Sequence, residues 1–173
     1  SLNGTNGFKL EGVNPGDHSG HSVTSAGAAN DGVMIDVNRD GIADLIIGAP
    51  YADDAVGAIY VVFGHTGAWS TPLSLASLNG TNGFNLTGIN KGDASGYSVA
   101  AGDVNGDLIA DLIIGAPSAL NVDNVVVGAI YVVFGHTSWS RSVSLASLNG
   151  INVFSLLGVN EGDASGNSVA AGD

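Results

Sequence analysis

The 173-residue chain has no cysteine and only four lysine and arginine residues in total. The lack of cysteine excludes disulfides and thiolate metal sites. The few cations stand against 16 aspartate and glutamate residues, giving a formal net charge of −12. This balance argues against a basic groove for nucleic acid and against binding to an anionic membrane surface. It suits divalent cations, because clustered carboxylates repel one another until a cation joins them.

Long apolar runs are also missing. The longest runs, such as residues 58–63, are far shorter than a membrane span, so we expect no membrane insertion. What the chain has in abundance is glycine, with 27 residues, and Val, Ile, Thr and aromatic residues placed between Gly, Asn and Asp. This composition favours many short strands joined by turns.

Internal repetition dominates the sequence. Ser-Leu-Asn-Gly begins at Ser1, Ser77 and Ser147, with spacings of 76 and 70 residues. Four further elements follow in a fixed order in the first two units, and the first two of these elements recur in the third. In the first unit these are an aromatic strand at 8–13, Gly-Asp-x-Ser-Gly at 16–20, Ala-Asp-Leu-Ile-Ile-Gly-Ala-Pro at 43–50 and Gly-Ala-Ile-Tyr-Val-Val-Phe-Gly-His-Thr at 57–66.

Each unit predicts four strands, which in the second unit are 98–103, 110–116, 129–134 and 154–159. The two middle strands are almost wholly apolar, as expected where both faces of a sheet are buried. Identical units with two apolar faces require identical neighbours, and a ring supplies them. The sequence therefore predicts an all-β fold of β-propeller blades, each of four antiparallel strands; a single long sandwich is the alternative.

We expect one domain over residues 1–173 that contains two full blades and partial flanking blades. Blade 1 covers about 20–90 and blade 2 about 96–160. A leading outer strand precedes them, and a partial blade follows at 166–173, where Asp173 aligns with Asp103. Such a chain cannot close a ring alone. We therefore expect it to pair either with copies of itself in a homo-oligomer or with the remaining blades of a longer chain.

A loop between the first two strands of each blade carries the chemistry. In the first loop, Asp36, Asn38, Asp40 and Asp44 place side-chain oxygens at positions one, three, five and nine, and Ile42 offers its backbone carbonyl at position seven. Calcium prefers six to eight such oxygen ligands. The second loop repeats the set in phase with Asp103, Asn105, Asp107, Ile109 and Asp111.

The alternative for these loops is that Asp, Asn and Gly simply form turns, but the recurrence of matched oxygens favours a Ca²⁺ site in each. An EF-hand would need a bidentate Glu at position twelve, where Ile47 and Ile114 stand. At position six, Gly41 permits a sharp turn. Leu108 replaces it in the second loop, which we expect to bind more weakly if this position needs a positive φ.

At this point the chain resembles the FG-GAP repeat family, the repeats of the integrin α-subunit propeller. Phe63-Gly64 and Phe134-Gly135 match the FG element, while Gly48-Ala49-Pro50 and Gly115-Ala116-Pro117 match the GAP element. The resemblance covers essentially the whole chain. It implies a propeller, usually seven-bladed in integrins, with calcium in the blade loops. It also implies a cell-surface or secreted setting and a role in adhesion or ligand binding.

Other candidate sites favour structure over catalysis. His65 and His136 recur in one motif, as do Trp69 and Trp139, which we expect to pack on a neighbouring blade rather than to form a sugar-binding surface. The contexts of Ser22 and Ser98 lack the second glycine of a nucleophile elbow. We therefore expect no enzymatic activity.

Three functions remain open. The first is a calcium-stabilised extracellular module that binds a protein or glycan ligand of unknown identity. The second is a non-catalytic accessory propeller of a secreted enzyme. The third is a purely structural, self-assembling repeat.

Overall fold

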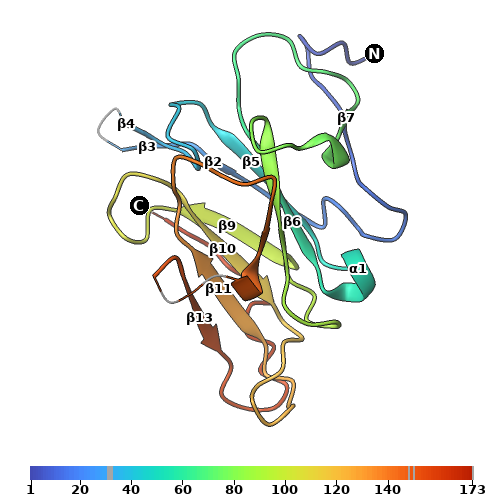
Figure 1. The fold of residues 1–173 in the computed structure, drawn as a ribbon, viewed down its shortest axis with the longest axis vertical. Coiled ribbons are helices and arrows are strands. Elements are labelled where there is room, and N and C mark those ends of the chain that lie inside the picture. The colour runs from blue at the N-terminus through green and yellow to red at the C-terminus, as the bar shows by residue number, and fades with distance from the viewer. Residues whose placement is uncertain (31–32, 148, 150, 173) are drawn as a thin grey trace.

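The computed structural model describes residues 1–30, 33–147, 149 and 151–172. Two larger sheets lie against each other, and the chain forms four strands of the first before it begins the second (Figure 1). Helix is confined to short turns, so the all-β prediction is confirmed. The predicted blade-like unit of four antiparallel strands is present in each of these two sheets.

Blade 1 contains four strands in the spatial order β2 (Ser22–Ala26), β5 (Asp44–Ala49), β6 (Ala58–Val62) and β8 (Gly83–Thr87). Every neighbouring pair among the four is antiparallel. Strand β6 is buried along its whole length, because its apolar run places side chains on both faces of the sheet.

Blade 2 repeats this order with β9 (Ser98–Gly102), β10 (Asp111–Ala116), β11 (Ala129–Val133) and β13 (Val153–Leu157). These bounds differ from the predicted strands by one or two residues. The repeat in the sequence is therefore a repeat of strand, order and direction.

Short elements that the sequence pattern did not predict join the blades. Two edge strands, β7 (Leu73–Ser74) and β12 (Ser142–Ser144), each lead into a 3₁₀ turn. Strand β12 runs parallel to β8, so the segment after the third strand of blade 2 adds a fifth strand to blade 1. Strand β7 pairs in the same parallel manner with β1 (Leu10–Glu11), which is the predicted leading outer strand.

Two smaller elements lie beside the blades. The hairpin of β3 (Ala28–Asn30) and β4 (Val33–Ile35) precedes the first acidic loop, and the short α1 (Ala52–Ala55) lies between β5 and β6. Residues 166–172 form no strand, and Asp173 lies outside the described residues. The partial third blade and the blade boundaries therefore stay predictions.

The main core lies between the two sheets. Alternate residues of a strand point to opposite faces, so Phe84 and Leu86 turn toward blade 2 while Asn85 and Thr87 stay half-buried. Alternate side chains of the two middle strands of blade 2, β10 and β11, pack against Phe84 and Leu86. Fully or almost fully buried in this layer are Ile46, Ile59, Val61, Phe84, Leu86, Leu112, Ile114 and Val133.

The sheets also approach closely where two glycine motifs meet. A methyl group added to Gly48, in the Gly-Ala-Pro of blade 1, would overlap the carbonyl oxygen of Gly96, the last residue of the next Gly-Asp-x-Ser-Gly. Gly115 stands in the same relation to the carbonyl oxygen of Gly166. Only a residue without Cβ fits such a contact, which explains why both motifs contain glycine.

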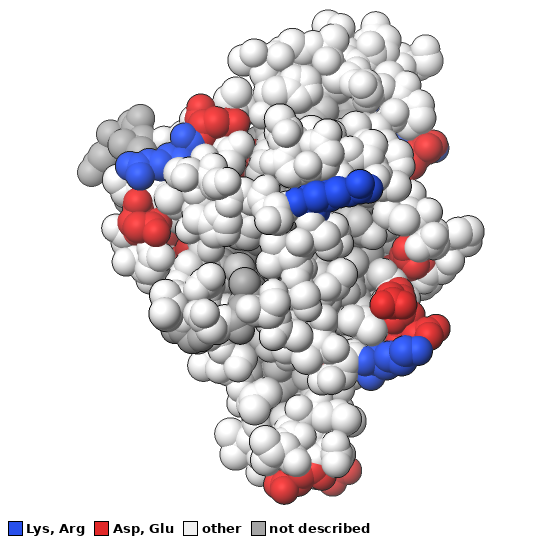
Figure 2. Space-filling view, viewed as in Figure 1, with Lys and Arg blue, Asp and Glu red and all other residues white. Residues whose placement is uncertain are grey.

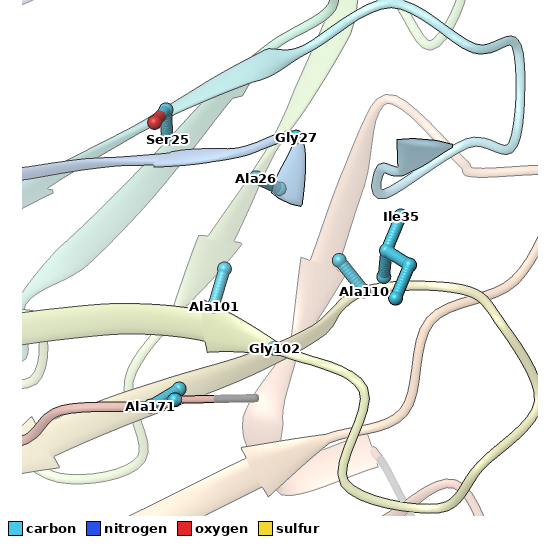
Figure 3. Close-up of a pocket in the computed structure, with 9 residues that line it drawn as sticks. Ser25, Ala26, Gly27, Ile35, Ala101, Gly102, Ala110 and Ala171 are labelled. Carbon is cyan, nitrogen blue, oxygen red and sulfur yellow. The ribbon is translucent and has the colours of Figure 1, made fainter. Parts of the chain in front are cut away.

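Near the starts of both acidic loops, a hollow of about 170 Å³ opens between strands β2 and β9 (Figure 3). Its labelled side chains are small or apolar, among them Ala26, Ile35, Ala101 and Ala110, and they carry no acid, base or thiol. The hollow therefore offers no chemistry of its own. The face in Figure 2 is largely uncharged, and its basic side chains lie apart from one another rather than in a patch.

Candidate metal centre

The first acidic loop connects β4 to β5 and begins at a fully buried carboxylate. Asp36 Oδ1 accepts hydrogen bonds from the backbone N–H groups of Asn38 and Asp40, at 3.2 and 3.0 Å, and Asp36 Oδ2 accepts one from Gly41 at 2.9 Å. The side chains of Asn38 and Asp40 are joined by an N–H···O bond of 3.0 Å. The short polar side chains thus fold the loop around its first residue.

The second loop is built in the same way. Asp103 accepts from the N–H groups of Gly106, Asp107 and Leu108 at 2.7 to 3.1 Å, and Asn105 Nδ2 donates to Asp107 Oδ2 at 3.1 Å. Equal sequence spacing therefore produces similar loops, although Asp36 accepts from the second residue after it and Asp103 from the third.

The ninth-position aspartates bind each loop to the FG element of the same blade. Asp44, which is fully buried, accepts from the N–H of Val37 and from the N–H of Gly64, both at 2.9 Å. Asp111 accepts from the equivalent Val104 and Gly135, both at 2.8 Å. The glycine of Phe-Gly is thus a partner of the acidic loop, a link that spacing along the chain did not reveal.

The donor set fits a hard cation, since each loop offers three carboxylates, one amide oxygen and a backbone carbonyl. No lysine or arginine neutralises these carboxylates, because the ion pairs among the described residues are Lys9–Glu11 and Lys91–Asp54. As the side chains lie, however, no three acidic or histidine groups in the described part of the chain form a cluster that could hold a metal. Turn formation alone also explains this hydrogen bonding, so the ten ligand assignments stay predictions.

Burial dominates the electrostatics of the ninth position. It raises the pKa of Asp44 from 3.8 to about 6; the charges of Asp36 and Asp40 add to the rise, and the two N–H bonds oppose it. Burial likewise raises the pKa of Asp111, with Asp107 and Asp103 adding to the rise. A nearby cation would favour the ionised form of both groups.

We predict that, in buffer free of divalent cations, stability falls as pH rises from about 4 to about 6. The native Asp44 holds its proton up to about pH 6, whereas the unfolded chain releases it near pH 4. The stabilisation is therefore complete below pH 4 and lost as pH passes 6. We expect a loss of about 1–2 kcal/mol after allowance for screening by water.

Urea unfolding across this pH range measures the effect, with Asp44→Asn as the comparison. The variant should flatten the pH dependence. A wild-type stability that rises steadily from pH 4 to pH 6 would contradict the assignment.

The sixth position of the loop adopts the left-handed conformation in both blades. Gly41 has φ 82° and Leu108 has φ 66°. The sixth position thus needs a positive φ in both loops. A non-glycine residue in this conformation costs about 1–2 kcal/mol, which supports the expectation that the second loop binds more weakly. We expect Leu108→Gly to raise the melting temperature, and Gly41→Leu to lower it by a comparable amount in thermal unfolding.

Blade 2 holds the first loop by two hydrogen bonds. The Ala110 N–H donates to the carbonyl of Asp36 at 2.9 Å, and the Trp139 indole Nε1–H donates to the carbonyl of Val37 at 3.2 Å. The first loop is therefore fixed by its own blade and by the next blade at once.

Trp139 is also part of an aromatic stack between the blades. Its ring lies 4.0 Å from that of Phe84 at an interplanar angle of 9°, and His136 stacks on it at 3.8 Å. Trp69 repeats the arrangement with Phe8 at 4.3 Å and His65 at 4.1 Å. The expected packing on a neighbouring blade is confirmed for Trp139, whereas Trp69 packs on the N-terminal segment; a histidine contacts each tryptophan.

No helix among the described residues has the length and apolarity needed to cross a membrane.

The model of the FG-GAP repeat matches this chain twice, over residues 28–62 and 95–133. Both matches contain an acidic loop and the strands that flank it.

Curated relatives include integrin alpha-PS2 of Drosophila melanogaster, 34% identical over 124 residues, which are 69% of this chain and 7% of the relative. Phosphatidylinositol-glycan-specific phospholipase D of Bos taurus is 35% identical over 113 residues, or 63% of this chain and 13% of the relative. Integrin alpha-2 of Mus musculus is 37% identical over 85 residues, or 48% and 7%. The chain thus spans only a small part of each relative.

Proposed function

Since this chain belongs to the FG-GAP repeat family, we propose that it is an extracellular, calcium-binding propeller module that serves adhesion or ligand binding. Calcium has a structural role in it, and the chain itself is not an enzyme. The ligand is a protein or a glycan.

One observation carries the calcium part of the proposal. Two loops, 36–44 and 103–111, present the same oxygen-bearing groups at the same spacing, and in both the first aspartate accepts the N–H of the fifth residue. No ion pair among the described residues involves their carboxylates. A cation in each loop would neutralise three carboxylates and fix the connection between the first two strands of a blade. It would also stabilise the contact of the first loop with blade 2, which runs through Val37 and Trp139.

Thermal unfolding with and without calcium tests the proposal. Loops of this kind in extracellular modules have dissociation constants near 10⁻⁴–10⁻³ M. At ten times the dissociation constant, each filled loop adds about 1.4 kcal/mol to the free energy of unfolding. We expect a clear rise in melting temperature at millimolar CaCl₂, and none in the double variant Asp40→Ala, Asp107→Ala.

A matched control removes two exposed acids outside the loops, Asp123→Ala with Glu161→Ala, and should keep the calcium effect. An equal calcium effect in the loop variant and in this control would refute binding at the loops. No calcium effect in the wild type would mean that the loops are only turns.

A second candidate function is that of a non-catalytic accessory propeller in a secreted enzyme. The similarity to phosphatidylinositol-glycan-specific phospholipase D over 113 residues favours it. Both candidates require the same cation loops. Binding of the purified chain to a protein or glycan array would favour adhesion or ligand binding over the accessory role.

A further inference from the structure

The outer strand β13 exposes apolar side chains that its counterpart β8 buries. Phe154 and Leu156 are 37% and 53% exposed, whereas Phe84 and Leu86, at the same repeat positions, are fully buried. These two side chains lie on the face of β13 that points away from blade 1, together with their cross-strand neighbours Val132 and Ile130. This face is therefore a copy of the interface between the blades that no second sheet covers among the described residues.

The interface between the two blades shows which elements pack against such a face. Strand β8 is covered by the edge strand β12, with Leu86 opposite Val143, and by Trp139, which stacks on Phe84. A matching pair of elements, the edge strand β7 and Trp69, lies at the other end of the molecule. We call these two elements the acceptor edge.

The acceptor edge is held by the N-terminal segment of the same chain. Strand β1 pairs with β7 in the same parallel register, with Leu10 opposite Leu73, and Phe8 stacks on Trp69. However, β1 is only two residues long, and its exposed pair Lys9–Glu11 adds little stability. The N-terminal segment is thus a small substitute for a complete blade.

The segment that contains β13 closely resembles this substitute. Residues 147–163 are identical to residues 1–17 at 12 of 17 aligned positions. One of these positions pairs Phe154 with Phe8, the residue that stacks on Trp69. Where they differ, Ser155 and Leu157 replace Lys9 and Glu11, so the later copy lacks both of these charges. It is also anchored in a four-stranded sheet, which fixes its extended backbone before any contact forms.

From this match we propose that the chain associates head to tail with a second copy of itself. Strand β13 of one copy takes the place of β1 on the acceptor edge of the next copy, with Phe154 on Trp69 and Leu156 opposite Leu73. The contact joins two different surfaces, so it forms rings where the rotation closes. Propellers contain four to eight blades, so two to four copies of residues 1–173 would supply the blades of one ring.

Light scattering on the 173-residue chain, with and without calcium, tests the surface. We expect a discrete oligomer for the wild type and a monomer for Leu156→Asp. The matched control is Leu157→Asp, because Leu157 is 50% exposed on the same strand but lies on its other face. This control should keep the oligomer.

A reversible disulfide tests whether β13 of a second copy replaces β1 on the acceptor edge. The chain has no cysteine, so Leu10→Cys with Leu73→Cys adds only one pair, at positions that are Cα partners in neighbouring strands, a spacing that a disulfide can bridge. Oxidation should hold β1 on its own chain and give a monomer, and reduction of the same protein should restore the oligomer.

Three outcomes would overturn the proposal. The first is a wild type that stays monomeric at every attainable concentration. The second is an oligomer that persists in Leu156→Asp, which would place the contact on another surface. The third is an oxidised locked variant that still associates. None of these depends on cation binding, so the loop variants test the proposed function separately.

Discussion

Phe84→Ala is expected to destabilise the chain by about 3–5 kcal/mol. The side chain is fully buried between the two blades, stacks on Trp139 at 4.0 Å and lies 5.8 Å from the ring of Phe63. Its removal opens a cavity in a layer whose backbone is fixed by two sheets, so little collapse can compensate. The truncation also leaves the Trp139 ring without its stacking partner on one face.

The repeat supplies the control for this prediction. Phe154 occupies the same repeat position but is 37% exposed, so Phe154→Ala should cost only about 1–2 kcal/mol. Both changes are best measured by urea unfolding in the Leu156→Asp background, which we expect to be monomeric. Equal losses for the two variants would mean that the blades do not depend on the stack between them.

Gly48→Ala is expected to cost about 3 kcal/mol or more, although it adds a single methyl group. The new Cβ would overlap the carbonyl oxygen of Gly96, which is backbone and cannot rotate away. The Gly48 carbonyl also accepts the N–H of Gly20 at 3.0 Å, so a shift of β5 would disturb a second contact. The cost therefore lies at the upper end of the range for overpacking.

Thermal unfolding of Gly48→Ala beside Gly172→Ala checks this expectation. A methyl group at Gly172 meets nothing within 4 Å, and its substitution should leave the melting temperature nearly unchanged. A Gly48→Ala protein as stable as the wild type would show that the sheets can separate at this point without cost.

Periodicity and repetition predicted most of the fold. The apolar runs of β5, β6, β10 and β11 identify strands buried on both faces, and the recurrence of the unit identifies the number of sheets. The edge strand β12 escaped prediction because its three residues, Ser-Val-Ser, are stabilised by pairing with β8 rather than by any pattern of their own. The β3–β4 hairpin was not predicted either.

For the site, the sequence predicted which polar side chains share a loop but not the contacts that hold the loop in place. Spacing was enough to place Asp36, Asn38 and Asp40 in one tight loop, because the loop is local. The contact of Asp44 with Gly64 spans 20 residues, and that of Trp139 with Val37 spans 102. Contacts of this length depend on how the sheets pair, which no local pattern encodes.

The position of Trp139 gives the chain a built-in optical reporter. The indole is 7% exposed and donates its only hydrogen bond to the first acidic loop, whereas Trp69 is half-buried beside the N-terminal segment. The emission of an indole depends on the polarity and hydrogen bonding around it. Indole fluorescence should therefore report changes at the acidic loop in the variant Trp69→Phe, where Trp139 is the remaining indole. In Trp139→Phe, where Trp69 remains, it should report changes at the acceptor edge.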